Sequence, residues 1–416
     1  MTSQLSHTRH APPSGPNRLL LAADPTLTTH LSCYGPPPNP AEPGGPTAAV
    51  AAAGLRGRGG AGFPVADKMA AVAAGRAPVV IANGAEGEPD SHKDATLLTR
   101  APHLVLDGLS AAAEAVGARE CHLYAPAALL EPVRAALAQR RSTGYDRRPV
   151  TLTPAAESFL SGEKTAVINR LAGRRPIPGD QLISTSRAGL HGRPTLVHNV
   201  ETLAQLALIA RYGPDWYRSA GTHEEPGTFL VTLSGTTAAG VVETPFGTSL
   251  LDLITRTGRT DPRTVRAVLI GGYHGTWIPG SELSRTTLSA AGLRPLNARL
   301  GAGVVRVLPY GHCGLRATAD IIAHLAAASA GQCGPCRNGL PELATRWHEL
   351  TYRGTGDPRE IARLTDLVDG RGACHHPDGT ARLLRSALHV FADDIDLHRQ
   401  GACTAGHPSN RGFRNE

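Results

Sequence analysis

Short apolar segments alternate with amphipathic ones between residues 79 and 152. Val79–Ala82, Glu120–Tyr124 and Val150–Leu152 have the length and composition of buried strands. Leu104–Val116 and Ala127–Gln139 have the periodicity of helices. Strands that alternate with helices in this way form a parallel sheet with right-handed crossovers. The sequence therefore predicts an α/β fold whose ligand lies beyond the carboxyl ends of the strands.

A glycine-rich stretch precedes the first of these strands. Five glycines fall within nine residues, with Arg58 among them and Lys68 shortly after. Backbone without Cβ atoms can wrap closely around an anion and offer it successive N–H groups, and the cations add charge where phosphate would lie. The spacing Gly57-x-Gly59-x-x-Gly62 fits the dinucleotide fingerprint, but the Ala-rich segment before it does not have the pattern of a strand. We therefore predict an uncommon kind of phosphate loop, with a flexible Gly/Arg loop as the alternative.

Three further polar segments stand where a ligand of this sheet would lie. Asn83–Asp90 follows the first predicted strand, and its carboxylates can accept hydrogen bonds from ribose hydroxyls, amides or flavin N–H groups. Gly162–Glu163 opens a helix, so backbone N–H groups point outward at its positive end. The segment Arg193–Leu203 leads into another helix, with His198 and Asn199 near its start. A polar turn and ordinary helix starts are the alternatives for each segment taken alone.

Charge and hydropathy exclude two classes of protein. The formal charge is +7, but the arginines are scattered and aromatic residues make up only 4% of the chain, so we expect no nucleic-acid partner. No run approaches the ~18 apolar residues of a membrane span, and the N-terminus has no signal-peptide core. We predict a cytoplasmic protein without direct membrane insertion, at most peripheral to a membrane through a complex. Of the 42 Lys and Arg residues only Lys68, Lys93 and Lys164 are lysine, and all three fall within the polar motifs.

The chain divides into five segments. Residues 1–47 are rich in Pro, Ser, Thr and His, which predicts a flexible arm. The α/β pattern covers residues 48–225. Four strands around a helix at Ser249–Arg256 predict a small β-grasp-type module over 226–312. Residues 313–400 have the pattern of a helical bundle, and 401–416 form a tail. The predicted bundle helices are Ala317–Ala328, Gly339–Thr351, Pro358–Val368 and Thr380–Leu397.

Two cysteine motifs lie in the helical part of the chain. Cys333-Gly-Pro-Cys336 is a thioredoxin-type dithiol sequence, but that chemistry requires a βαβ setting and the flanks here are helical. With Cys374 and either His375 or His376, the pair would complete a zinc site. An iron–sulfur cluster usually takes four thiolates, and three cysteines converge here. No role is assigned to Cys33, Cys121, Cys313 and Cys403.

Five motifs, taken in order, resemble those of a known family. They are Gly57–Lys68, Asn83–Asp94, Gly162–Asn169, Pro194–Leu203 and Cys333–Gly339, with Cys374 after them. Over roughly residues 48–400 the chain looks like the NADH-binding flavoprotein subunit of respiratory complex I and the related diaphorase subunits of soluble hydrogenases and formate dehydrogenases. The resemblance implies a Rossmann-like domain for FMN and NADH, a β-grasp (SLBB-like) module, and a four-helix bundle with a [4Fe-4S] cluster. It further implies an NADH dehydrogenase in which hydride passes from NADH to FMN, and electrons then pass singly through the cluster to a partner, usually a thioredoxin-like [2Fe-2S] subunit.

The resemblance also implies roles for individual residues. The glycine loop with Arg58 and Lys68 would cradle FMN, and Asn83 with the helix start at Gly162–Glu163 would border the isoalloxazine ring. Phe63 and Glu88 would contact NADH, and no side chain need act as acid or base, because the flavin carries the chemistry. Val197, His198, Asn199 and Thr202 would hold the phosphate end. The full implied set is Gly57, Arg58, Gly59, Gly60, Gly62, Lys68, Asn83, Glu86, Gly162, Glu163, Lys164, Val197, His198, Asn199 and Thr202 for FMN, and Cys333, Cys336 and Cys374 for iron.

Four positions depart from the family pattern. Asn83-Gly-Ala-Glu86 replaces Asn-Ala-Asp-Glu, so one acidic flavin contact is lost. Lys164 replaces a Glu near the nicotinamide, and His198 replaces the first Asn of Asn-Asn-Val-Glu-Thr. Ala330 occupies the position of the first cluster cysteine. The cluster would therefore be [3Fe-4S], or [4Fe-4S] with a fourth ligand other than cysteine.

Two alternatives follow from these departures. Asn-Gly-Ala-Glu-x-Glu-Pro and Gly-Glu-Lys also resemble the electron-transport flavoprotein RnfC, although that protein lacks the pattern Asn199-Val-Glu-Thr202 seen here. The chain could instead be a degenerate paralogue that serves as a binding or assembly module, with zinc or with no metal. The physiological acceptor and the direction of electron flow stay open.

Overall fold

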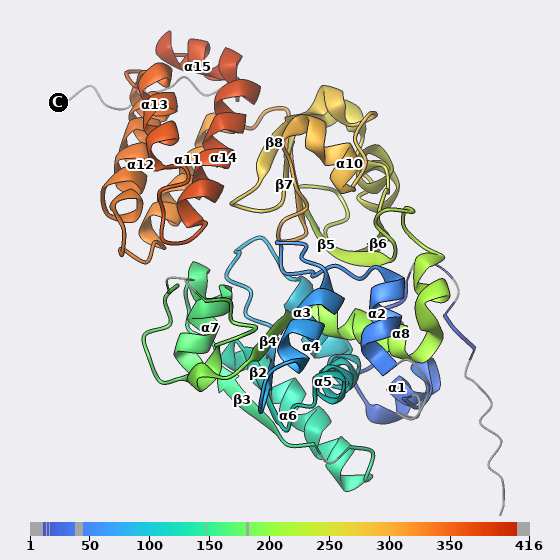
Figure 1. The fold of residues 1–416 in the computed structure, drawn as a ribbon. Helices are drawn as coiled ribbons and strands as arrows, with labels where there is room; N and C mark the ends of the chain where they lie inside the picture. The colour runs from blue at the N-terminus through green and yellow to red at the C-terminus, as the bar shows by residue number, and fades with distance from the viewer. Residues whose placement is uncertain are drawn as a thin grey trace, which may run out of the picture.

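The computed structural model describes residues 11–13, 15, 17–37, 45–146, 148–179 and 183–405. They form a parallel α/β domain, a second sheet and a group of C-terminal helices (Figure 1). The first domain lies at the bottom of Figure 1, and the other two parts lie side by side above it. The mixed α/β class with a parallel sheet is as predicted. Within these residues, no helix combines the length and the apolar character that crossing a bilayer requires.

Four parallel strands form the first sheet, in the order β3-β2-β1-β4. They are β1 (Val79–Asn83), β2 (Glu120–Ala125), β3 (Val150–Pro154) and β4 (Thr195–Asn199). The first three confirm the predicted strands. The sequence analysis missed β4 and expected its residues to lead directly into a helix. The strand forms because its apolar centre, Leu196–Val197, pairs with β1 and is buried on both faces of the sheet.

Helices cover both faces of this sheet. On one face Val80, Ala82 and Leu196 share a core with the helices α5 and α8. On the other face Val79 and Ile81 pack against α7. The helices of this domain are α1 (Leu27–Tyr34), α2 (Gly45–Ala53), α3 (Val65–Ala73), α4 (Lys93–Arg100), α5 (Pro102–Val116), α6 (Ala127–Ser142), α7 (Lys164–Leu171) and α8 (Val200–Arg218).

The second sheet has five strands in the order β6-β5-β9-β7-β8. They are β5 (Thr228–Ser234), β6 (Gly240–Pro245), β7 (Val265–Ile270), β8 (Thr276–Pro279) and β9 (Val304–Pro309). β5 and β9 run parallel, and the other neighbours are antiparallel. The sequence analysis expected four strands and missed β8, which is only four residues long. The expected helix Ser249–Arg256 is α9 (Leu250–Asp252) followed by a π-helical turn to Thr257, and a short α10 (Ala290–Leu293) follows β8.

The C-terminal helices pack on the second sheet. They are α11 (Gly314–Ala327), α12 (Leu340–His348), α13 (Pro358–Val368), α14 (His376–Val390) and α15 (Ala392–Arg399). Their core includes Leu269 and Trp277 from the second sheet. The predicted single helix Thr380–Leu397 is divided at Phe391, whose backbone leaves the helical region (φ −110°, ψ 27°). The Phe391 ring packs edge-on against Trp277, with 5.2 Å between the ring centroids.

Residues 17–37 differ from the flexible arm that the sequence predicts. Leu19 and Tyr34 are buried in the core of the first domain, and α1 packs against it. The backbone N–H groups of Arg18 and Leu19 both donate to Glu243 Oε2 of the second sheet, at 2.7 Å. A few apolar side chains and two backbone hydrogen bonds therefore fix this segment, despite its Pro-rich surroundings. The remainder of the predicted arm, residues 1–10, 14, 16 and 38–44, lies outside the described residues, as does the tail after residue 405.

Candidate functional site

The carboxyl ends of β1 and β4 carry a pair of asparagines. Asn83 and Asn199 stand opposite each other in the parallel register, and Asn199 Nδ2 donates to the Asn83 carbonyl oxygen at 3.4 Å. Asn199 also caps α8, because its Oδ1 accepts the backbone N–H of Glu201 at 3.0 Å. The two predicted residues therefore lie together at the edge where open α/β sheets bind their ligands.

A buried charge network braces Asn199, and the sequence analysis did not assign Lys93, Asp94 or Glu201 to the site. Lys93 Nζ donates to Asn199 Oδ1 at 3.1 Å and lies 2.7 Å from Asp94 Oδ1 and 3.0 Å from Glu201 Oε2. Burial disfavours the charge on Lys93, but the carboxylates of Asp94, Glu201 and Glu86 outweigh it and raise its pKa. The scarcity of lysine pointed to Lys93, and only the fold shows that its ammonium positions Asn199.

The glycine loop folds back on itself beside Asn199. The Gly57 N–H donates to the Phe63 carbonyl oxygen at 2.9 Å. Gly60 and Gly62 have φ values of +94° and +62°, in the left-handed region that favours glycine. The Phe63 side chain is 58% exposed at the end of this turn, so one ring face is accessible to a planar ligand.

The Arg58 side chain is held by contacts within the chain. Its backbone N–H donates to Thr202 Oγ1 at 2.8 Å, which ties the loop to α8. Its guanidinium donates to the Tyr217 hydroxyl at 2.8 Å and to the Thr228 carbonyl at 3.2 Å, and lies 4.5 Å over the Phe246 ring. These partners come from the end of α8 and from the second sheet. Arg58 therefore anchors the glycine loop to the junction between the two sheets.

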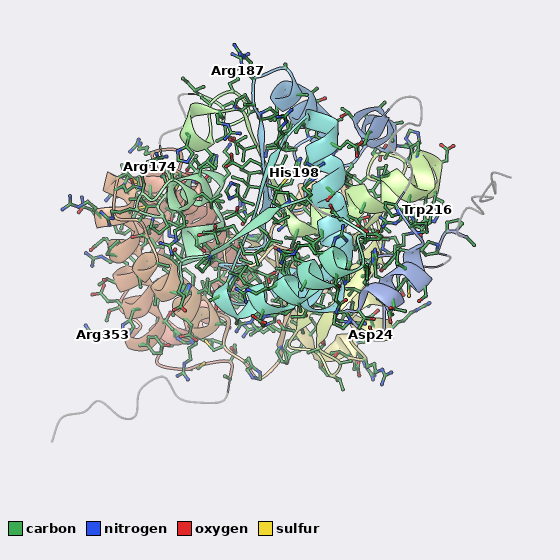
Figure 2. The ribbon with its side chains drawn as sticks, turned by 90° about the horizontal axis from the view of Figure 1, so that it is seen from below. Asp24, Arg174, Arg187, His198, Trp216 and Arg353 are labelled. Carbon is green, nitrogen blue, oxygen red and sulfur yellow. The ribbon has the colours of Figure 1, made fainter. Side chains whose placement is uncertain are left out.

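His198 lies buried in the first domain, as Figure 2 shows, and Lys68 lies half-buried close to it. Lys68 Nζ donates to the Val197 carbonyl oxygen. Burial, and then the charge of Lys164, lower the pKa of Lys68 to about 8. Burial and the Lys68 charge hold the pKa of His198 well below its ordinary value, so its imidazole is neutral. His198 Nε2 is buried and has no hydrogen-bond partner among the described residues.

Glu86 is occupied by contacts within the chain. It accepts the backbone N–H groups of Asp94 and Ala95, each at 3.2 Å, and the Ser91 hydroxyl at 2.5 Å. These contacts place its carboxylate at the N-terminus of α4, where the helix dipole favours negative charge. Burial, and then the neighbouring Asp94, nevertheless raise the pKa of Glu86.

Glu88 and Asn83 connect the acidic turn to other parts of the chain. Glu88 Oε2 accepts the backbone N–H of Tyr273 at 2.8 Å, and burial raises the pKa of Glu88 to about 7. Asn83 Nδ2 donates to the Gly162 carbonyl at 2.9 Å. At Gly162 a Cβ atom would lie 2.7 Å from the Ala85 carbonyl oxygen, so only glycine allows this approach. Glu163 caps α7 through the N–H of Thr165 at 2.8 Å, as the predicted helix start requires.

A cavity of about 1000 Å³ opens beside the glycine loop. Gly57, Arg58, Gly60 and Gly62 line one wall together with Lys93 and Glu201, and the opposite wall comes from residues 294–301 and α14. Lys68, Asn83, Gly162, Val197 and His198 are not part of this wall. The predicted residues are therefore divided between those that line this cavity and those that do not.

The three predicted metal ligands lie in one region at the start of α12 and α14. The Cys333 and Cys336 thiols hydrogen-bond to each other, and both interact with Cys374. Burial, with Cys333 and then Cys374 beside it, raises the pKa of Cys336 to about 12. The charge of Glu163 in the first domain also acts on Cys374, after burial, to raise the pKa of its thiol. Gln332 Nε2 also contacts that domain by donating to the Pro178 carbonyl at 2.7 Å.

The fourth position of this thiol group has no donor in the Ala330 side chain. His376, one of the two histidines in the zinc alternative, already uses both ring nitrogens: Nδ1 lies 3.0 Å from His274 Nε2, and Nε2 lies 2.8 Å from the Leu325 carbonyl oxygen. The His375 side chain is 98% exposed and pairs with Asp378 at 3.0 Å. The geometry therefore disfavours a zinc site completed by His376.

Two family models match the chain. The Nuo51 FMN-binding domain matches residues 50–208, and the NADH-ubiquinone oxidoreductase-F iron-sulfur binding region matches residues 316–398. These ranges contain the paired asparagines and the three cysteines, respectively.

Curated proteins and solved structures show the same relationship. The second of two F subunits of NADH-quinone oxidoreductase from Rhizobium meliloti is 34% identical over 83% of this chain and 86% of its own length. The F subunit of NADH-quinone oxidoreductase from Mycobacterium tuberculosis is 30% identical over 84% and 83%. A chain of an NAD+-reducing [NiFe]-hydrogenase in the H2-reduced state superposes with a TM-score of 0.78 at 30% identity, over 86% of this chain. This chain spans only 63% of that hydrogenase chain.

Proposed function

Because the chain belongs to the family of NADH-quinone oxidoreductase F subunits, we propose that it is an FMN-dependent NADH dehydrogenase subunit. The observation that carries the proposal is the pairing of Asn83 with Asn199 beside the glycine loop, within the range that the FMN-binding domain matches. Hydride would pass from NADH to FMN, and electrons would then leave singly through an iron–sulfur cluster to an acceptor. Bound FMN would supply the conversion from a two-electron donor to one-electron carriers.

The residues of the first domain fit FMN. The His198 imidazole offers a buried nitrogen that has no hydrogen-bond partner among the described residues. The Lys68 ammonium is held in a desolvated position. Both features fit a polar ligand that would supply the missing hydrogen bond and a counter-charge. Lys68, Asn83, Val197, His198, Asn199, Thr202 and the loop glycines would hold the cofactor, with Glu86, Gly162, Glu163 and Lys164 at its border. Arg58 would act through the loop backbone.

Phe63 and Glu88 are proposed to contact NADH. The exposed Phe63 ring offers a stacking surface for a planar base, and the Glu88 carboxyl can accept a hydrogen bond from a ribose hydroxyl. Lys164, exposed at the start of α7, brings a cation where the family carries a carboxylate. These residues bind and orient the donor, and none of them needs to transfer a proton.

Cys333, Cys336 and Cys374 are proposed to hold the iron–sulfur cluster. The fold brings the segments before α12 and α14, which carry these cysteines, into one region, and the missing thiol at Ala330 favours [3Fe-4S], or [4Fe-4S] with another fourth ligand. We propose that residues 226–312 form a β-grasp module of the SLBB type, since the outer strands flank a parallel central pair. A thioredoxin-like [2Fe-2S] subunit is the proposed partner, and the proposed location is cytoplasmic, within a complex.

An anaerobic titration of the purified protein with NADH, followed by visible spectroscopy, tests the proposal. Bleaching of a bound flavin band is the expected result. A bound flavin that NADH leaves oxidised would point to another donor. A colourless protein that takes up no FMN would favour the second candidate, a non-catalytic paralogue, which the alanine at position 330 also favours.

A further inference from the structure

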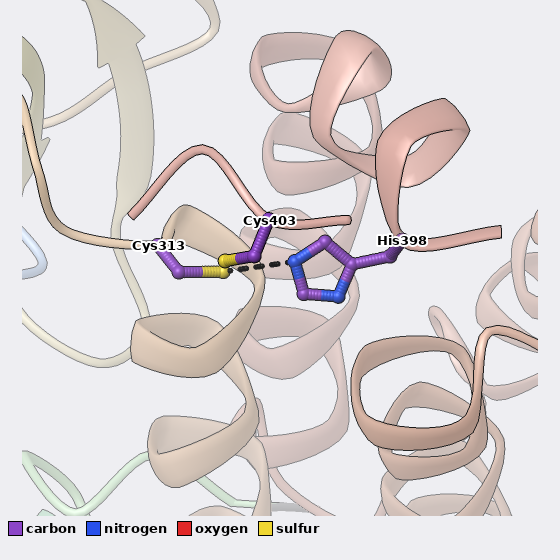
Figure 3. Close-up of side chains that lie close together, drawn as sticks. All are labelled: Cys313, His398 and Cys403. Carbon is purple, nitrogen blue, oxygen red and sulfur yellow. Dashed lines mark hydrogen bonds between the residues drawn. The ribbon is translucent and has the colours of Figure 1, made fainter. Parts of the chain in front are cut away.

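Cys313, His398 and Cys403, none of which belongs to the three cysteines described above, converge at one end of the C-terminal helices (Figure 3). One ligand atom from each lies within 4.8 Å of the other two, and Cys313 Sγ lies 3.3 Å from His398 Nε2. In the part of the chain that the structure describes, no other group of His, Cys and acidic side chains meets this criterion. The residues come from the N-cap of α11, the last turn of α15 and the segment after it, so the fold alone brings them together.

The surroundings of His398 fix its orientation toward the two sulfurs. His398 Nδ1 lies 2.7 Å from the Thr351 carbonyl oxygen, which can only accept, so Nδ1 carries the proton. The lone pair of Nε2 therefore faces Cys313. A backbone carbonyl behind the distal nitrogen is the usual support of a metal-bound imidazole. His398 is 1% exposed and Cys313 is 5% exposed, so the site excludes bulk water on two sides.

Donor groups and a positive charge surround the two cysteines. Cys313 Sγ accepts the backbone N–H of Arg316 at 3.5 Å, at the positive end of the fourteen-residue helix α11. The Arg266 guanidinium donates to the His312 carbonyl at 3.1 Å and to the Thr404 hydroxyl at 2.7 Å. Arg266 thus holds the neighbours of both cysteines and brings a positive charge next to them.

Asp394 links Arg266 to α15, the helix that carries His398. Arg266 also pairs with Asp394 Oδ1, and Asp394 lies one helical turn before His398 on the same face of α15. Asp394 is fully buried, and its Oδ2 has no hydrogen-bond partner among the described residues. Each of the three converging segments is therefore braced by one arginine, and one carboxylate oxygen beside them is left unpaired.

We propose that Cys313, His398 and Cys403 form a binding site for a thiophilic divalent cation of the zinc class. Two thiolates and a neutral imidazole balance the charge of such an ion in a buried setting. Two sulfurs about 2.3 Å from a tetrahedral zinc ion lie about 3.8 Å apart, so donor atoms already within 4.8 Å need only small movements. Water would take the fourth position. The ion would join the segment after α15 to the start of α11, and the site does not depend on the proposed function.

Metal analysis of the full-length protein, purified without a histidine tag, tests the proposal. We expect about one zinc per chain in the unmodified protein and a roughly fivefold or greater loss in C403S and in H398Q, with iron unchanged. C374S should lose iron and keep zinc. C33S, which changes a cysteine outside both groups, should keep both metals.

A second measurement keeps the proposal testable if a variant does not fold. Substitution of the unmodified protein with Co²⁺ should give a sulfur-to-cobalt charge-transfer band, and X-ray absorption of the zinc form should show two sulfurs and one nitrogen. Absence of zinc after incubation with excess ZnCl2, or zinc that C403S retains, would overturn the proposal. A Cys313–Cys403 disulfide in a peptide map of the as-isolated protein would overturn it as well and would indicate a redox pair.

Discussion

The side-chain amide of Asn199 donates to the backbone carbonyl of Asn83 at 3.4 Å, across two parallel strands that end at the same level. Asn199 simultaneously caps α8 and accepts from Lys93, so one residue links the sheet edge, a helix N-terminus and a buried ammonium. The proposed ligand site and the packing of the domain therefore share the same side chain.

Asn199→Ala should lower both stability and flavin binding. The variant loses the cap of α8 and leaves the Lys93 ammonium with one partner fewer, so we expect the free energy of unfolding to fall by about 1–3 kcal/mol. Urea denaturation and FMN titration measure the two effects. Asn199→Ser is the matched control, because serine can restore the cap but cannot reach Lys93. Equal flavin affinity in the unmodified protein and in Asn199→Ala would contradict the assignment of Asn199 to the FMN site.

Lys68 should make the stability of the flavin-free protein depend on pH above neutrality. Its pKa is about 8 in the folded protein, against an ordinary value of 10.5. Between these two pH values the unfolded chain therefore keeps Lys68 protonated while the folded protein has released that proton. Stability therefore rises as pH increases from about 8 toward 10.5, and the charged amine costs about 3 kcal/mol below this window. Thermal melts of Lys68→Met should lack this rise, whereas its FMN affinity should fall at least roughly tenfold with the lost cation.

Lys164→Gln separates the two causes of that shift. The Lys164 charge contributes to the low pKa of Lys68 after burial, so its removal should move the stability rise of the flavin-free protein to higher pH. A pH profile that Lys164→Gln leaves unchanged would mean that burial alone sets the pKa of Lys68.

Glu88 should make kcat/KM for NADH depend on pH near neutrality. Its pKa is raised from 4.5 to about 7, so the carboxylate forms only as pH rises through about 7. If the carboxylate accepts a hydrogen bond from NADH, kcat/KM for NADH should increase over this range by roughly tenfold. Glu88→Gln, which can still accept the Tyr273 N–H, should flatten the profile. A Glu88→Gln profile that keeps the same inflection would assign it to another group.

The raised pKa of Glu88 also predicts that stability falls with rising pH, whereas the lowered pKa of Lys68 predicts that it rises. The folded protein holds the Glu88 proton more tightly than the unfolded chain, so stability falls as pH rises from 4.5 to about 7. Urea denaturation of Glu88→Gln should show less of this fall than the unmodified protein.

Ala330→Cys should complete the thiolate set at the cluster. A fourth thiolate would hold the iron that a three-cysteine site loses most readily, so iron should rise from about three to about four atoms per chain. Iron analysis and EPR of anaerobically purified protein measure the change, with Ala330→Ser as the control of similar size. No gain of iron and an unchanged EPR signal would contradict the placement of the cluster at Cys333, Cys336 and Cys374.

Arg58→Lys should affect stability more than flavin affinity. Lysine cannot reproduce the forked contacts of the guanidinium with Tyr217 and Thr228, so the free energy of unfolding should fall by about 2 kcal/mol. The FMN dissociation constant should change less than about threefold, because the loop backbone keeps its bond to Thr202. The opposite pattern, stable protein with weak flavin binding, would return Arg58 to the phosphate role that the resemblance implies.

Much of the first domain could be predicted from local patterns. The apolar segments that became β1, β2 and β3 were unambiguous, and the polar residues after β1 followed from the rule that ligands gather at carboxyl ends. β4 was missed because two polar residues follow its short apolar centre and α8 begins immediately after it. Asn199 was thus placed at a helix start without the strand that pairs it with Asn83.

The features that could not be predicted from the sequence depend on contacts between residues that lie far apart along the chain. The groups that hydrogen-bond with the Arg58 guanidinium lie as many as 170 residues away, and no local pattern encodes them. Cys313 and His398 are separated by 85 residues, so neither could be linked to a site by spacing. In both cases the residue types were visible, but the side chains acquire their roles only when distant elements pack.

The hydrogen bonds from Arg18 and Leu19 to Glu243 constrain the order in which the chain can fold during translation. Arg18 leaves the ribosome 225 residues before its acceptor, which at ordinary translation rates is a wait on the order of ten to forty-five seconds. All four strands of the first sheet are synthesised within that interval, since β4 ends at Asn199. The N-terminal segment can dock on Glu243 only after β6 has been synthesised. The N-terminal residues therefore reach their native contacts later than the strands of the first sheet can form.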